Sequence, residues 1–186
     1  MKRLLLMRHA KSSWKQPVAD AMRHLNERGR RSARAVALEL ELMDLEPDLV
    51  LASNATRCRE TFGEMTRRTR WMNEKRVKDV KYLSEFYGIF DRPATEQIFL
   101  SVQEHAREDH ESVLCLGHNM GWELALDELV GPRGRRSCGS PLEMNTADLF
   151  VLECALDSWD DVFLSRGRWA VRQTIRSREL IGEEKR

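Results

Sequence analysis

Residues 4–9 read LLLMRH, a short apolar run that ends in an arginine and a histidine. An apolar run of this length between polar residues is typical of a buried strand, so we predict a strand over residues 2–7. Two later runs end in a similar way: LVLA at 49–52 leads into Ser53 and Arg57, and VLCL at 113–116 leads into Gly117 and His118. Ligands of an open α/β sheet bind beyond the carboxyl ends of its strands. If the three strands are parallel neighbours, these polar residues meet at one edge.

The segments between and after these runs carry other regular patterns. Ala33, Val36, Ala37 and Leu40 recur at helical spacing, and Asn26 precedes them as a helix N-cap. The same signals predict a helix capped by Ser53 or Asn54, a strand over 77–83, a helix after Pro93, a helix opened by Asn119, a loop over Gly131–Pro141, and strands over 147–153 and 169–175. Alternating strands and helices predict an α/β fold, a three-layer α/β/α arrangement with a mostly parallel central sheet. Because no linker divides the chain, we expect residues 1–186 to form a single domain.

The composition excludes several classes of protein. The chain has 186 residues and a formal net charge of +1, which argues against a general nucleic-acid binder. No apolar run approaches the roughly 20 residues of a membrane helix, and the run at 4–7 is too short for a secretory signal. Four scattered cysteines fit no zinc or disulfide pattern: Cys58, Cys115, Cys138 and Cys154. We therefore expect a cytoplasmic protein, with a eukaryotic organelle as the alternative.

The two arginines and two histidines at the strand ends suit the chemistry of phosphate. Arg8 and Arg57 each offer a planar fork of N–H donors that matches phosphate oxygens. His9 is placed to act as a nucleophile toward phosphorus, and His118, if cationic, to stabilise the oxygens. Such a site needs no metal or cofactor, because side chains supply the positive charge.

Four segments resemble a known family. Arg8-His9-Ala10 after a short strand resembles the R-H-G motif of the histidine phosphatase superfamily, also called phosphoglycerate mutase-like, and residues 5–14 look like its small SixA-type branch. The other matching segments are LNERG at 25–29, SNATRCRET at 53–61 and LGHN at 116–119. Together they occur in the family's order and span residues 1 to about 130.

The resemblance implies a role for each matching residue. His9 is the expected nucleophile that becomes phosphohistidine, and the expected phosphate pocket consists of Arg8, Arg57 and His118. Further contacts to the phosphate or substrate are expected from Lys11, Ser12, Ser53 and Asn119. Larger members carry an acidic proton donor in an L-x-E-x-x-x-G segment. Here LSEFYG at 83–88 offers Glu85, with a shorter spacing to the glycine; Glu85 is alternatively a surface carboxylate.

The sequence therefore predicts a metal-independent phosphatase without cofactor. It would hydrolyse a phosphomonoester or a protein phosphohistidine through a covalent intermediate on His9. A short chain leaves little room for a lid, which favours a shallow site and a phosphorylated protein or small phosphoester as partner, with no nucleic acid or membrane. The alternatives are a mutase-type phosphotransferase and a non-catalytic module that binds phosphorylated ligands. The oligomeric state stays open.

Several other residues have both a functional and a purely structural interpretation, or only a structural one. The arginines of the 131–141 loop, from Arg133 to Arg136, form either a solvated loop or a rim that steers the substrate. Cys58 beside Arg57 has either a lowered thiol pKa or a packing role. The histidines without apolar context are predicted on the surface: His24, His105 and His110.

Overall fold

The computed structural model of the chain describes residues 1–88, 92–137 and 142–182. Its strands are β1 (Lys2–Arg8), β2 (Leu49–Ser53), β3 (Asp79–Leu83), β4 (Ser112–Gly117), β5 (Leu149–Cys154) and β6 (Ala170–Ile175). Its helices are α1 (Glu27–Leu42), α2 (Thr56–Thr66), α3 (Ala94–His105), α4 (Gly121–Ser137) and α5 (Ser177–Leu180), with short 3₁₀ segments η1 (Asp20–Met22) and η2 (Trp159–Ser165). The predicted strands are all present, with small shifts of their ends.

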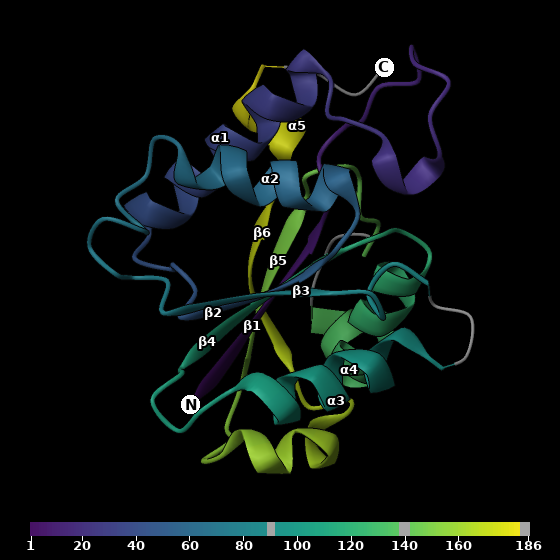
Figure 1. Cartoon of the computed structure of the whole chain (residues 1–186). Coiled ribbons are helices and arrows are strands. Elements are labelled where there is room, and N and C mark those ends of the chain that lie inside the picture. The colour runs from purple at the N-terminus through teal and green to yellow at the C-terminus, as the bar shows by residue number, and fades with distance from the viewer. Residues whose placement is uncertain (89–91, 138–141, 183–186) are drawn as a thin grey trace.

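The strands form one six-stranded sheet in the order β3-β2-β4-β1-β5-β6. Strands β3, β2, β4 and β1 run parallel to one another, whereas β5 is antiparallel to both β1 and β6. Helices α1, α2 and α5 cover one face, and α3, α4 and η2 cover the other (Figure 1). The predicted three-layer α/β/α fold with a mostly parallel sheet is confirmed. Among the described residues, no helix is long and apolar enough to cross a membrane.

The apolar run of β1 is buried on both faces of the sheet. Leu4 and Leu6 pack into the core beneath α3 and α4, while Leu5 and Met7 pack against α1 and α2. All four side chains are fully buried. A strand covered on both faces needs a continuous apolar run rather than an alternating one, and each such side chain stabilises the fold by about 1.5–3 kcal/mol.

Of the N-caps predicted for α1 and α2, the structure confirms only the first. Asn26 caps α1 as predicted, since its side-chain oxygen accepts a hydrogen bond from the Gly29 amide at 2.8 Å. The prediction that Ser53 or Asn54 caps α2 is wrong, because the N-cap is Ala55 and no side chain caps this helix. Ser53 stays in β2, and its hydroxyl is used elsewhere, as described below.

The predicted loop over Gly131–Pro141 is wrong as far as Ser137. Helix α4 bends at Gly131, which has a φ of +65°, and helical turns resume beyond Pro132. Glycine tolerates this left-handed conformation, and proline suits the first turn of a new helical segment. Of the predicted arginine cluster, Arg135 pairs with Asp127 of the same helix. Residues 138–141, including Cys138, lie outside the described residues.

Candidate active site

The carboxyl ends of β1, β2 and β4 lie level with one another, which brings the candidate residues together. Arg8 of β1 pairs with Gly117 of β4, and the His9 amide donates to the Gly117 carbonyl at 2.9 Å. On the other side of β4, strand β2 ends at Ser53, and Arg57 follows in the first turn of α2. The predicted convergence of residues that lie far apart in the sequence therefore exists in the structure.

His9 is held in one tautomer by the backbone carbonyl of the next residue, Ala10. Its Nδ1 lies 2.8 Å from the Ala10 carbonyl oxygen, which can only accept, so Nδ1 carries the proton. The Nε2 atom then bears a lone pair, which accepts from the Arg57 Nε–H at 3.2 Å. Burial, opposed by the Ala10 hydrogen bond and aided by the charges around it, lowers the pKa of His9 to about 3. His9 is therefore neutral at physiological pH, with an unprotonated Nε2.

His118 lies across Arg57 from His9, with the two imidazole centroids 5.1 Å apart. Its Nδ1 accepts from Arg57 Nη2 at 3.0 Å, and its Nε2–H donates to the Ser53 hydroxyl at 2.9 Å. Burial and the positive charge of Arg57 lower the pKa of His118 to about 4. The sequence argument considered a cationic His118, but in the free protein this imidazole is neutral.

Arg57 also holds a carboxylate that the sequence did not indicate. Its Nη2 donates to Asp20 Oδ2 at 2.9 Å, and its Nη1 donates to the Asp20 carbonyl at 2.6 Å. Asp20 also accepts from the Tyr87 hydroxyl at 3.1 Å and from Arg23 Nη1 at 2.9 Å. The segment from Lys11 to Leu25 reads only as a polar loop, and its one usable signal is the Asp20-x-x-Arg23 spacing of an ion pair.

The other predicted residues lie around this group. Arg8 donates to the Met144 carbonyl at 2.9 Å, and its buried Nε has no partner among the described residues. Ser12 is buried, and its hydroxyl accepts from Arg23 Nη2 at 2.6 Å. Asn119 is half-buried, and its Oδ1 lacks a hydrogen-bond partner in the part of the chain that the structure describes.

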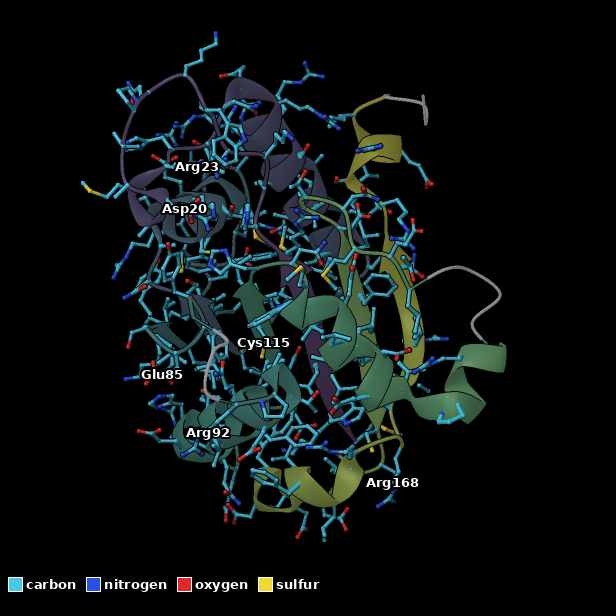
Figure 2. The ribbon with its side chains drawn as sticks, turned by 90° about the vertical axis from the view of Figure 1, so that its right-hand side faces the viewer. Asp20, Arg23, Glu85, Arg92, Cys115 and Arg168 are labelled. Carbon is cyan, nitrogen blue, oxygen red and sulfur yellow. The ribbon has the colours of Figure 1, made fainter. Side chains whose placement is uncertain are left out.

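Two predicted residues are exposed instead of being gathered with the histidines. The side chain of Lys11 is exposed to solvent. Glu85 is also exposed, and among the described residues its carboxylate takes one hydrogen bond, from Ser84 at 3.1 Å. Figure 2 shows Asp20 and Arg23 together on one segment, with Glu85 on another. The candidate proton donor from the sequence is therefore not in contact with Arg57, whereas Asp20 is.

Comparison with known proteins shows the family to which this chain belongs. The family model of the histidine phosphatase superfamily (branch 1) matches residues 4–114. The chain belongs to this superfamily. An uncharacterized chloroplastic protein of Arabidopsis thaliana is 31% identical over 169 residues, which cover 89% of this chain and 72% of that protein.

Two solved structures are similar to this chain. A SixA from Agrobacterium tumefaciens, assigned as a phosphohistidine phosphatase, is 26% identical with a TM-score of 0.70 over 94% of this chain and 97% of that chain. A second structure, from Nakamurella multipartitia and also assigned as SixA, is 24% identical. Its TM-score is 0.73 over 94% of this chain and 95% of that chain, so the two proteins share a fold. Membership of the superfamily supports phosphatase activity in general.

Cys58 resolves one of the two readings that the sequence left open. Its thiol is fully buried on α2, 3.6 Å from His118 Nε2. Burial raises its pKa to about 12 despite the neighbouring charge of Arg57. The thiol is therefore not an activated nucleophile. No group of three or more metal-ligating side chains occurs within the described ranges.

Proposed function

We propose that this protein is a metal-independent phosphatase that works through a covalent phosphohistidine on His9. The observation that carries the proposal is the unprotonated Nε2 of His9, which lies within 3.2 Å of the Arg57 guanidinium. A neutral imidazole beside a fixed cation is a nucleophile with an anion-binding group next to it. His118 Nδ1 also accepts from Arg57, at 3.0 Å, but only His9 directly follows the Arg8 end of β1 and so lies next to a second arginine in the sequence.

In the proposed reaction, Arg57 and Arg8 bind the phosphoryl oxygens. The His9 Nε2 lone pair attacks phosphorus in line, forming a P–N bond while the bond to the leaving group breaks. Water then attacks the phosphohistidine, the P–N bond breaks, and phosphate leaves with His9 restored. An anion beside His118 raises its pKa, so the imidazole takes a proton from solvent at Nδ1 and donates it to a phosphoryl oxygen. Positioning and charge stabilisation of this kind supply most of the catalysis of phosphoryl transfer.

The proposed substrate is a phosphomonoester or a phosphohistidine on a protein. The SixA relative at 26% identity is assigned to phosphohistidine, which favours that class. An imidazole leaving group requires less help from an acid than an alkoxide does, which agrees with the exposed position of Glu85. The cysteines Cys58, Cys115 and Cys154 are unpaired, which is compatible with a reducing compartment such as the cytoplasm or an organelle.

The test compares the wild type with His9→Asn, in which the Asn amide can keep the hydrogen bond to the Ala10 carbonyl. Both are incubated in chelator with an aryl phosphate and with a phosphohistidine-bearing protein. His105→Asn on α3 is the matched control. We expect turnover by the wild type and the control, none by His9→Asn, and a trapped acid-labile phosphoprotein only where His9 is present.

Activity of His9→Asn near that of the wild type would refute the proposal. Phosphate-dependent binding without turnover would establish the binding module instead. Transfer of the phosphoryl group to a second organic acceptor in preference to water would establish the phosphotransferase.

A further inference from the structure

The anion-binding group of the site already carries an anion of the protein itself. An arginine has five N–H donors, and in Arg57 four of them are engaged: one by His9, one by His118 and two by Asp20. A phosphoryl group that requires two donors of this guanidinium therefore has to displace one of these acceptors, and Asp20 is the exposed one, because His9 and His118 are buried. The Asp20 carboxylate occupies a place that the substrate needs.

Asp20 is held by contacts that allow this exchange. Its side chain is 50% exposed and belongs to the short segment η1. The segment before η1, from Trp14 to Ala19, is exposed throughout and has no regular structure. Half-exposed ion pairs are worth at most about one order of magnitude in binding. A dianionic phosphoryl group that reaches both Arg57 and Arg8 therefore displaces the carboxylate readily.

We propose that substrate phosphate displaces the Asp20 carboxylate from Arg57, and that Asp20 then serves as the proton donor to the leaving group. This inference rests on the proposed phosphatase function and deepens it. Arg23 and Tyr87 contact Asp20 independently of Arg57, so they keep the carboxyl group beside the bound phosphate. Within the described part of the chain, Glu85 makes no hydrogen bond or ion pair with Asp20 or Arg57.

The exchange at Arg57 also changes the proton affinity of Asp20 in the required direction. In the free protein, partial burial raises the pKa of Asp20, but hydrogen bonds from Arg23 and the charge of Arg57 outweigh this and lower it to about 2. Loss of the Arg57 contact removes one of these causes, and the adjacent phosphate dianion disfavours a second negative charge. Both changes raise the pKa of Asp20 while the substrate is bound, which is the direction that a proton donor requires.

The two chemical steps then balance. In the first, His9 Nε2 forms the P–N bond, the P–O bond to the leaving group breaks, and the leaving oxygen takes the proton of Asp20. In the second, the Asp20 carboxylate takes a proton from water as the water oxygen attacks phosphorus. The P–N bond breaks, its electron pair returns to His9, and inorganic phosphate departs.

The test uses leaving groups of different basicity, with 4-nitrophenyl phosphate as the good one and phenyl phosphate as the poor one. The variants are Asp20→Asn, Glu85→Gln and a control, Asp161→Asn. Asp161 is exposed on η2, which lies at the opposite end of the sheet from the segment that carries Asp20 (Figure 1). For each variant, kcat and kcat/KM are measured against pH, together with inhibition by inorganic phosphate.

For Asp20→Asn we expect kcat on phenyl phosphate to fall by about 10²–10⁴-fold, the usual contribution of a general acid. The fall on 4-nitrophenyl phosphate should be much smaller, and the alkaline limb of the pH profile should disappear. Inorganic phosphate should bind about two- to fivefold more tightly, since a competing ion pair of this exposure is gone. The control and Glu85→Gln should behave as the wild type does.

Equal losses on both esters, or selective loss in Glu85→Gln in place of Asp20→Asn, would overturn the assignment of Asp20 as proton donor. Failure of the phosphatase function gives a different result, because the wild type then turns over neither ester. In that case the affinity for inorganic phosphate still tests whether phosphate displaces Asp20 from Arg57. Asp20→Asn that binds phosphate no more tightly than the wild type would reject it.

Discussion

Acidification from about pH 7.5 to about pH 5 should remove about 4 kcal/mol of stability through His9 and His118. Burial is the main cause that lowers their pKa values from 6.5, to about 3 and about 4. In the unfolded chain both imidazoles bind a proton below about pH 6.5, whereas in the folded protein they stay neutral until near pH 4. The unfolded state therefore gains protons first, and stability falls as the pH drops. Each histidine contributes about 2 kcal/mol, from 1.4 kcal/mol per pH unit over the 1.5 units below 6.5.

Urea unfolding at a series of pH values, followed by tryptophan fluorescence, measures this loss. The comparison is with the double variant His9→Asn/His118→Gln, in which Asn retains the donor at Nδ1 and Gln the donor at Nε2. His110, whose pKa burial also lowers, contributes equally to both proteins and cancels. Carboxyl groups with lowered pKa, such as Glu64, titrate below this window. If the wild type and the double variant lose the same free energy of unfolding between the two pH values, the claim that His9 and His118 are neutral in the folded protein is refuted.

Three further predictions concern the support of the site. Thr61 is buried and accepts from the Ala10 amide at 3.0 Å, so Thr61→Val should cost about 1–3 kcal/mol in urea unfolding by leaving that amide unpaired. A Cβ at Gly117 would lie 2.5 Å from the Trp122 ring, so Gly117→Ala should cost about 1–3 kcal/mol by overpacking and should lower kcat as well. The buried thiol of Cys58, with a pKa raised to about 12, should resist iodoacetamide in the native protein near pH 8 and react in urea, as followed by mass spectrometry.

The parallel part of the fold follows from local sequence, because each of its central strands is buried on both faces and reads as one apolar run. The meeting of His9, Arg57 and His118 needs only one further rule, that parallel strands end at the same edge of the sheet. These features were therefore predictable. Membership of the family adds the order of the motifs and does not alter this physical reason.

The features that the sequence missed depend on contacts between distant segments. His110 was predicted on the surface and is fully buried, because Lys2 and Trp159 both donate to its carbonyl, at 2.9 and 2.7 Å. These partners lie 108 and 49 residues away in the chain. The contact of Asp20 with Arg57 also crosses 37 residues and depends on how a loop without periodicity folds back over α2. No local pattern encodes either contact.

Arg57 links the two roles that the proposed mechanism separates. In the free protein its Nε–H engages the His9 lone pair that must attack phosphorus, while its Nη2 engages the Asp20 carboxylate. A lone pair shared with a donor is less available to phosphorus than a free one. On the proposed mechanism, phosphoryl oxygens compete for the same guanidinium, so their binding weakens the hold on both side chains at once. Substrate binding thus frees the nucleophile and the acid together, and neither is fully released while the site holds only its own carboxylate.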